Sequence, residues 1–223
     1  MSNSNNWDSI IRSTSGDIKR LSSVWRFNSI PVSTQETTAE HSYWVTLYSV
    51  LVHKEVSGRN FDRLLGTVML KAAVHDVPEC VTGDLVRTFK YATPELKKEV
   101  DRAEGILSQK LNPEIRALIT VSELLIEDPE INGYVKDVVK VADFMSLFQF
   151  MRREALRGNL EIYPFYKRMV SDLEMMILET ASHEHKVCPA GMFVFKPSEV
   201  YASMAKEACH TSNVCFHRAE ELF

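Results

Sequence analysis

The sequence lacks the features that mark membrane and secreted proteins. No apolar run reaches the roughly 18 residues that a membrane-spanning helix needs. The N-terminus has neither the basic stretch nor the apolar core of a signal peptide. These absences predict a cytoplasmic protein with no membrane partner. Cysteine is scarce and follows no disulfide framework spacing, so we expect reduced thiols at Cys80, Cys188, Cys209 and Cys215.

An excess of positive charge is also missing. The 223 residues carry a formal net charge of -4, and the isoelectric point is near 6.0. A general nucleic-acid-binding protein normally carries a basic domain or stripe, so we expect no nucleic-acid partner, whereas small phosphorylated ligands remain compatible with this charge. The 45% hydrophobic and 25% charged content is that of an ordinary soluble protein, and the length suits one domain with a small appendage.

Strand patterns are missing as well. We find no convincing run of alternating apolar and polar residues and no internal repeat. Apolar residues recur at helical spacing instead, so we predict an all-α fold, with loops at 24–37 and 76–91 and a turn from Asp128 to Gly133. Helices are expected at 7–23 (one or two short ones), about 38–56, 61–75, 94–110, 113–127, 134–157, 163–182, 198–209 and 213–222.

Three of the predicted helices have recognisable capping residues at their start. Thr37-Thr38-Ala39-Glu40 has the form of a capping box, in which a threonine and the glutamate three residues later satisfy each other's backbone amides. Thr93-Pro94-Glu95 and Asn112-Pro113-Glu114 each combine an N-cap residue, a proline at the first helical position and an acid in the first turn. These residues predict where the three helices begin.

The stretch richest in chemically active residues follows an apolar helical run and reads His75-Asp76-Val77-Pro78-Glu79-Cys80-Val81-Thr82-Gly83-Asp84. Neighbours on a helix point about 100° apart, so His75 and Asp76 reach one point only where the helix ends. A proline and a glycine break the helical pattern just beyond. Glu79 and Asp84 follow, and the group suits a hard cation and acid/base chemistry. Alone, such a dipeptide is weak evidence, because most are surface or core pairs.

Two further residues offer ligands from other predicted helices. Asp143 lies on the apolar face of its helix, where an unpaired carboxylate costs several kcal/mol. Its partner is either a basic residue, such as Lys140 or Arg152, or a metal ion. His41, in the first turns of its helix, is either a core or capping histidine or a ligand. Together with His75 and Asp76 (the HD pair), His41 and Asp143 make a set of two imidazoles and two carboxylates.

The combination of these motifs resembles one family over about residues 20–180. It is similar to the HD-domain metal-dependent phosphohydrolases, and within them to the YfbR-like 5′-deoxynucleotidases. The resemblance implies an HD-domain helical bundle that binds a deoxynucleotide, holds one divalent cation (Co, Mn, Mg, Fe or Zn) and forms a homodimer. The implied metal ligands are His41, His75, Asp76 and Asp143. The matching motifs are Glu40-His41-Ser42, His75-Asp76 with Glu79 and Thr82-Gly83-Asp84, and Val141-Ala142-Asp143.

The resemblance also assigns roles to two acids. It implies that Glu79 orients or deprotonates the attacking water and that Asp84 lies near the leaving oxygen and the sugar. Both roles make chemical sense, because in-line attack at phosphorus needs a base on one side and an acid on the other. The alternative is that both acids cap or solvate a loop.

Upstream, the family carries an Arg-Trp pair 15 and 14 residues before the metal-binding histidine, which contacts phosphate and base or sugar. This chain has Arg26 and Phe27 there, with Trp25 one residue early. We expect Arg26 to bind phosphate oxygens in a bidentate manner. Phe27 is our candidate for packing on the sugar or base, with Asp84 or Trp25 as the alternative readers of the sugar.

Downstream of Asp84, the family reads L-P-x-P-V-K-Y, and this chain departs from it. Lys90 matches the family lysine and is an expected substrate contact, but both prolines are missing. Arg87 is an additional cation in this segment. It either favours a longer phosphate chain in the substrate or is a solvated loop residue.

We expect an HD domain over residues 1–182 and a helical extension, 183–223, packed on the same domain or on a second subunit. The extension holds seven of the eleven cysteine and histidine residues, but no C-x-x-C pair that would favour a zinc site. The predicted function is a 5′-deoxynucleotidase that releases phosphate from deoxynucleoside monophosphates. The rivals are a deoxynucleoside triphosphate triphosphohydrolase, acting for example on dATP, and a catalytically inactive nucleotide-sensing HD module. A pure binder has no need of both Glu79 and Asp84.

Overall fold

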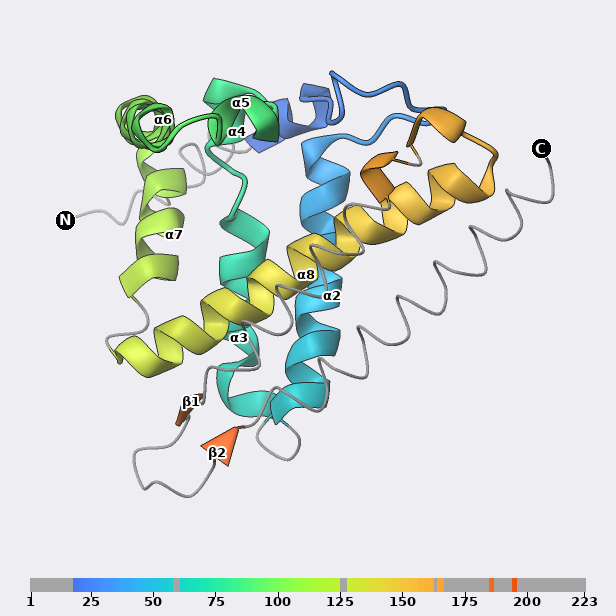
Figure 1. Ribbon diagram of the computed structural model, residues 1–223. Helices are drawn as coiled ribbons and strands as arrows, with labels where there is room; N and C mark the ends of the chain where they lie inside the picture. The colour runs from blue at the N-terminus through green and yellow to red at the C-terminus, as the bar shows by residue number, and fades with distance from the viewer. Residues whose placement is uncertain are drawn as a thin grey trace.

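One long helix, α8 (Pro129–Leu156), passes across α2 (Thr38–Ser57) and α3 (Phe61–Val74), and it packs on both (Figure 1). The computed structural model describes residues 18–57, 61–124, 128–162, 164–166, 185–186 and 194–195. The other elements in chain order are η1 (Ile18–Ser23), α4 (Glu79–Thr82), α5 (Arg87–Lys90), α6 (Pro94–Ser108), α7 (Pro113–Leu124), η3 (Leu160–Ile162), β1 (His185–Lys186) and β2 (Val194–Phe195).

The prediction of an all-α fold is confirmed, with one small addition. The two-residue strands β1 and β2 pair antiparallel, with His185 opposite Phe195 and Lys186 opposite Val194. Strands this short carry no readable alternation of apolar and polar residues, so the sequence gives no signal for them. None of the described helices is both long enough and apolar enough to cross a membrane.

The predicted capping residues act as expected. In the capping box of α2, the Glu40 carboxylate accepts a hydrogen bond from the Thr37 backbone amide at 2.8 Å, and the Glu40 amide donates to Thr37 Oγ1 at 3.2 Å. The Thr93 hydroxyl accepts from the Leu96 amide at 3.1 Å, which starts α6. Asn112 Oδ1 accepts from the amide of Glu114 at 2.9 Å in the first turn of α7.

The predicted turn from Asp128 to Gly133 is wrong, because α8 begins at Pro129. Asp128 is an N-cap whose side chain accepts from the amides of Glu130 and Ile131, and Pro129 takes the first helical position. The same combination of an N-cap residue and a proline at the first helical position begins α6 and α7. Gly133 follows within the helix, where glycine costs only about 1 kcal/mol relative to alanine.

The loop predicted over 76–91 contains two single turns of helix, α4 and α5. Four residues are too few to show a helical period in the sequence. Gly83, at φ 71°, ends α4, a backbone angle that glycine adopts without the strain of a side chain. The two turns shape the segment between the HD pair and α6.

The core lies where α8 crosses the other two long helices. Its main cluster combines Val52 of α2, Val68 of α3 and one face of α8, and η3 adds Ile162. A second cluster, which includes Leu21, Cys80, Leu111 and Ile115, joins η1, α4 and α7. Burial of aliphatic and aromatic side chains, worth about 25 cal/mol per Å² of apolar surface, holds the crossing together. The buried residues of the main cluster on α8 are Tyr134, Val135, Val138, Val141, Phe144, Phe148, Phe150, Met151 and Ala155.

Glu154 ties the segment before α2 to the end of α8. Its fully buried carboxylate accepts hydrogen bonds from the Ser33 amide and hydroxyl at 2.5 and 2.8 Å, from Thr34 Oγ1 at 2.6 Å and from Asn159 Nδ2 at 3.0 Å. Burial acts to raise the pKa of Glu154, but the hydrogen bonds from Thr34, Asn159 and Ser33 lower it to about 2. The charged form is therefore the one that the fold stabilises.

We expect Glu154→Gln to lower the free energy of unfolding by about 3 kcal/mol at neutral pH. Because the folded pKa lies below the unfolded value, the stabilisation is present above the unfolded pKa, about 4.3, and is lost as the pH falls through about 2. Urea denaturation at pH 7 and pH 3 measures the effect, which should shrink at the lower pH. Glu161→Gln, at an exposed position, is the control. Equal stability of the two variants at pH 7 would contradict the prediction.

Several predicted features lie outside the described residues. The helix expected at 163–182 is described only at 164–166, which is helical. Most of 7–23 and both helices expected at 198–209 and 213–222 also lie outside them, and the division at residue 182 stays a prediction. Cys80 is a buried thiol rather than half of a disulfide, as expected. The other three cysteines lie outside the described residues.

Candidate metal centre and active site

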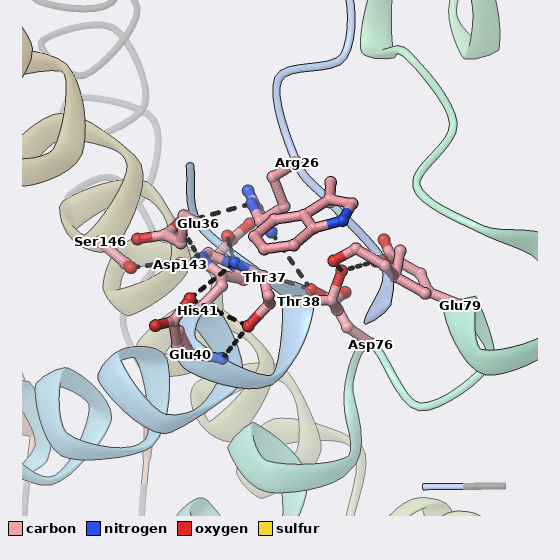
Figure 2. Close-up of polar contacts among 12 residues, drawn as sticks. Arg26, Glu36, Thr37, Thr38, Glu40, His41, Asp76, Glu79, Asp143 and Ser146 are labelled. Carbon is pink, nitrogen blue, oxygen red and sulfur yellow. Dashed lines mark hydrogen bonds and ion pairs between the residues drawn. The ribbon is translucent and has the colours of Figure 1, made fainter. Parts of the chain in front are cut away.

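His41 is at the centre of the site, and the capping box places it in the first turns of α2 (Figure 2). Its side chain is fully buried. The Nε2 atom lies 2.9 Å from Asp143 Oδ1 of α8 and 3.6 Å from Asp76 Oδ2. Helix crossing therefore brings together three residues that are far apart in the sequence.

His75 and Asp76 follow directly after α3 ends at Val74. The end of the helix lets both side chains reach one point, as the sequence predicts: His75 Nε2 lies 3.1 Å from Asp76 Oδ2. His75 Nδ1 lies 2.6 Å from the carbonyl oxygen of Ala72 and donates to it. This hydrogen bond sets the tautomer and leaves the lone pair of Nε2 for a cation, an arrangement common among metal-binding histidines.

The donor set fits a divalent cation. The ligand atoms of His41, His75 and Asp76 all lie within 4.8 Å of one another. Both Nε2 atoms are buried and make no hydrogen bond, although carboxylate oxygens face them. A lone pair facing a carboxylate is repulsive unless positive charge lies between them. Burial acts to lower the pKa of His75, but the Asp76 carboxylate raises it, so the site favours added positive charge. Neutral imidazoles and carboxylates are common ligands of Zn²⁺, Mn²⁺ and Co²⁺.

Asp143 is the fourth predicted ligand. Among the described residues its ion-pair partner is His41, rather than Lys140 or Arg152. Its side chain is 43% exposed, so the carboxylate lies at the open side of the site. The structure groups the ligand atoms of three of the predicted residues, His41, His75 and Asp76, and places Asp143 beside His41. The role of these residues as metal ligands stays a prediction.

The far side of the His41 ring meets two polar groups. Nδ1 lies 3.1 Å from Ser146 Oγ and 3.8 Å from Glu36 Oε1. Ser146 is on α8, one turn beyond Asp143, so one helix contacts both nitrogens of the ring. A partner on Nδ1 orients the imidazole so that Nε2 faces the site.

Arg26 lies between two carboxylates. Its Nη1 is 3.5 Å from Asp76 Oδ2, and its Nε is 3.6 Å from Glu36 Oε1 (Figure 2). The Arg26 amide also donates to the Glu36 carbonyl at 2.9 Å, which fastens the segment to the start of α2. Burial raises the pKa of Glu36 to about 7, against the opposing effect of Arg26. The guanidinium therefore lies beside Asp76, one of the predicted metal ligands, and its contact with phosphate stays a prediction.

Phe27, the predicted sugar- or base-packing residue, is partly buried against α8. Its ring stacks on Phe150 of α8, with centroids 4.3 Å apart and planes at 12°, and the Arg26 guanidinium carbon lies 5.6 Å from the ring centroid. Phe27 has a φ of 61°, a strained value for a bulky residue. The neighbouring Trp25 is 43% exposed. A base- or sugar-packing role for Phe27 stays a prediction, and this placement favours the alternative at Trp25.

Glu79 begins α4, one turn beyond Asp76. Its Oε2 accepts a hydrogen bond from Thr38 Oγ1 at 2.9 Å. Burial and the nearby Asp76 carboxylate raise the pKa of Glu79 to about 8, although the hydrogen bond from Thr38 acts against the rise. A carboxyl group with a pKa close to neutral can both take up and return a proton.

Asp84 directly follows Gly83, which ends α4. Burial raises the pKa of Asp84, and the positive charge of Arg26 opposes that rise. The backbone of Phe27 also acts to lower this pKa. Asp84 therefore lies near the segment that carries Arg26.

Lys90 and Arg87 are the two basic residues predicted downstream of Asp84 as substrate contacts. Lys90 Nζ forms an ion pair with Glu104 Oε1 of α6 at 2.7 Å, so in this structure it stabilises the packing of α5 on α6. Arg87 begins α5, and its side chain is outside the described part of the structure. A substrate contact at either residue stays a prediction.

A pocket of about 290 Å³ lies between α2 and α8 and adjoins the centre from behind His41. Glu36 and Ser146, which face His41 Nδ1, are part of its wall. The predicted metal ligands themselves do not line it. The remaining lining residues are Trp44, Tyr48, Gln149, Phe150, Arg152, Arg153 and Leu156.

Three residues of the site are absent from the sequence-based prediction: Glu36, Thr38 and Ser146. Ser146 has a readable signal, because it lies three positions beyond Asp143 and therefore on the same helix face. Thr38 stands inside the capping box, but only its neighbour Thr37 has the capping role. Glu36 is an acid in a predicted loop, and only the fold shows that it is buried.

Solved structures share this fold at low sequence identity. The cyanophage S-2L HD phosphohydrolase DatZ, solved with dA and one catalytic Zn²⁺ ion, gives a TM-score of 0.58 at 19% identity, over 86% of this chain and 93% of that one. The PH0347 protein of Pyrococcus horikoshii OT3 gives 0.61 at 16% identity, over 92% and 99%. An HD-domain phosphohydrolase of Listeria innocua gives 0.56 at 20% identity, over 94% and 99%. These matches show the fold alone.

Sequence comparison identifies the family. The 5′-deoxynucleotidase YfbR of Escherichia coli O127:H6 is 28% identical over 142 residues, which cover 62% of this chain and 71% of that protein. The 5′-deoxynucleotidase ECA3034 of Pectobacterium atrosepticum is 26% identical over 161 residues, 71% of this chain and 80% of that protein. The family model described as 5′-deoxynucleotidase YfbR-like matches residues 15–187. Because that match covers well over half of the sequence, the chain belongs to the YfbR-like 5′-deoxynucleotidase family.

Proposed function

We propose that the protein is a metal-dependent 5′-nucleotidase that hydrolyses 2′-deoxyribonucleoside monophosphates to deoxynucleoside and phosphate. The observation that carries the proposal is the group formed by His41, His75 and Asp76, with Asp143 beside His41 and Arg26 beside Asp76. Membership of a family whose named relatives are 5′-deoxynucleotidases supports the substrate class. A divalent cation, when bound, supplies positive charge for the phosphoryl oxygens and makes water easier to deprotonate.

The side chains around the centre divide the remaining work. Arg26 binds phosphate oxygens and holds the phosphoryl group near Asp76. Glu79 accepts a proton from the attacking water, whose oxygen forms the new bond to phosphorus. The bond from phosphorus to the 5′-oxygen breaks, and Asp84 donates a proton to that oxygen. The raised pKa of Asp84 suits a proton donor. The pKa of Glu79, about 8, lets this residue take up a proton and release it again in each turnover.

The test is a substrate panel with Mn²⁺ or Co²⁺. Free phosphate is measured by malachite green, and nucleosides by chromatography, for dAMP, AMP and dATP. We expect free phosphate and deoxyadenosine from dAMP. Tripolyphosphate from dATP, with no product from dAMP, would identify the protein as a triphosphohydrolase instead. An absence of product from every substrate would favour the nucleotide-sensing module and contradict the proposal.

The predicted contacts of phosphate and sugar are separable by mutation. We expect Arg26→Ala to weaken kcat/KM for dAMP and AMP alike, because the guanidinium binds the phosphate that both share. Phe27→Ala should also lower kcat/KM for both substrates, because the Phe27 ring lies beside Arg26 and stacks on Phe150. Trp25→Ala should instead erode the preference for dAMP by roughly tenfold, a typical worth of one desolvated hydroxyl.

Steady-state kinetics on the dAMP and AMP pair measure these effects. A reduced dAMP/AMP ratio in Phe27→Ala, with the ratio unchanged in Trp25→Ala, would assign the sugar contact to Phe27. If the dAMP/AMP ratio of kcat/KM stays at its wild-type value in both variants, Asp84 is left as the reader of the sugar.

Three further properties are part of the proposal: a homodimer, a cytoplasmic location and the absence of a nucleic-acid partner. The family resemblance supports the dimer. The net charge of -4 supports the last point, because nucleic-acid binders are normally basic. Sedimentation of the purified protein at micromolar concentration measures the oligomeric state.

A further inference from the structure

Thr38 makes a contact that its position in the helix does not require. The capping of α2 is complete without it, because Thr37 and Glu40 satisfy each other. The Thr38 side chain is nevertheless fully buried, and its hydroxyl donates to Glu79 Oε2 at 2.9 Å. The distance from Thr38 Oγ1 to the Val24 carbonyl is 3.5 Å, which is long for a hydroxyl bond. Glu79 is therefore the main acceptor of this donor.

The backbone around Thr38 is held on two sides, so the hydroxyl is a fixed donor. The Thr38 amide donates to the Val24 carbonyl at 2.9 Å, and Trp25 pairs with Thr37 in an isolated β-bridge. These contacts join the start of α2 to the segment that carries Arg26. Figure 2 shows the result: Thr38 points from α2 toward Glu79, across from Arg26.

Glu79, in contrast, is carried by a helix of only four residues. The backbone of α4 holds its Cα, since the Glu79 amide donates to the Asp76 carbonyl and its carbonyl accepts from Gly83. The side chain still has several rotatable bonds, and Asp76 and Asp84 repel its charged form. In the described part of the chain, Thr38 is the one side chain that hydrogen bonds to this carboxylate. Without that bond, the carboxylate would keep rotamer freedom that catalysis has to remove.

We propose that Thr38 is a positioning residue for hydrolysis: its hydroxyl holds Oε2 of Glu79 so that Oε1 faces the attacking water. The inference rests on the proposed function, because it concerns the group that accepts the proton of the water. A buried hydroxyl costs free energy unless it is hydrogen bonded, and a valine of nearly the same shape would avoid that cost. The threonine therefore contributes its hydroxyl rather than its volume.

The matched pair Thr38→Val and Thr38→Ser separates the hydroxyl from the shape. We expect Thr38→Val to lower kcat on saturating dAMP about tenfold, the worth of one hydrogen bond to a charged group. KM for dAMP and the metal content should stay within about twofold, because Thr38 contacts neither the predicted metal ligands nor Arg26 through its side chain. Thr38→Ser, which keeps the donor, should retain most of the wild-type kcat.

Two controls distinguish positioning from a loss of structure. Thr46 lies two turns along the same helix, and its hydroxyl donates to the Ser42 carbonyl at 2.8 Å within that helix, so Thr46→Val should leave kcat unchanged. The second control is a double-mutant cycle. If Thr38 acts through Glu79, Thr38→Val should have no further effect in a Glu79→Gln background. Melting temperatures of all variants are measured alongside.

A wild-type kcat in Thr38→Val would overturn the inference, and so would a loss in Thr38→Ser as large as in Thr38→Val. An equal fall in kcat in the Glu79→Gln background would also overturn it, because the effect would then be independent of Glu79. These outcomes leave the proposed function standing, since the wild type still releases phosphate from dAMP. If the wild type releases no phosphate from any deoxynucleoside monophosphate, the proposed function fails and the inference fails with it.

Discussion

Replacing His75 and Asp76 together by alanine is expected to remove the divalent cation from the protein and to abolish phosphate release. The two side chains supply two of the three ligand atoms that lie within 4.8 Å of one another. Of the four predicted ligands, His41 and Asp143 would be left, and one imidazole with one carboxylate is too few for a tight divalent site. Activity should therefore fall to the limit of detection.

Metal analysis after dialysis against Mn²⁺ or Co²⁺ measures the loss directly. Circular dichroism should show that the helices remain, because neither the main nor the second core cluster includes His75 or Asp76. The control is Glu99→Ala with Asp101→Ala, two exposed acids on α6, which should leave the metal content unchanged. A metal content in the His75→Ala, Asp76→Ala variant equal to that of the wild type would refute the ligand assignment.

Replacing Glu79 by glutamine is expected to lower kcat by roughly 10² to 10⁴, the usual contribution of a positioned acid or base. Glutamine keeps the size of the side chain and can still accept from Thr38, but it cannot take a proton from water. Metal content and the affinity for dAMP should change little, because Glu79 is not among the four predicted ligands. The variant should therefore separate catalysis from binding.

Stopped assays at saturating dAMP measure kcat, and calorimetry measures binding of the nucleotide. Glu95→Gln, at an exposed position in the first turn of α6, is the control for a change of charge alone. Wild-type turnover in Glu79→Gln would show that the attacking water needs no carboxylate, and the acid would then have a structural role on α4.

The parts of the fold that could be predicted are those whose signals are local. The start of α2 followed from a capping box of four residues, and the end of α3 followed from the break after the HD pair. The start of α8 at Pro129 has the same signal as α6 and α7, an N-cap residue followed by proline and an acid, and Gly133 does not break the helix. The single turns α4 and α5 have no period that a pattern could reveal.

The candidate site divides in the same way. His41, His75, Asp76 and Asp143 carry motifs, and the crossing of α8 with α2 and α3 brings them together. Thr38 and Glu79 are 41 positions apart, and their hydrogen bond depends on how α2 and α4 pack, which no local pattern records. The stacking of Phe27 on Phe150 likewise joins residues far apart in the sequence, and no local pattern predicts it.

The central claim is that phosphate release from a deoxynucleoside monophosphate requires one cation, which is held by His41, His75, Asp76 and Asp143. The most direct measurement is a titration of metal-free protein with Mn²⁺ while phosphate release from dAMP is followed. We predict no activity without metal and a rise that reaches its plateau at one equivalent per chain, with no rise in the His75→Ala, Asp76→Ala variant. Full activity of the metal-free protein, or the same rise in that variant, would contradict the claim.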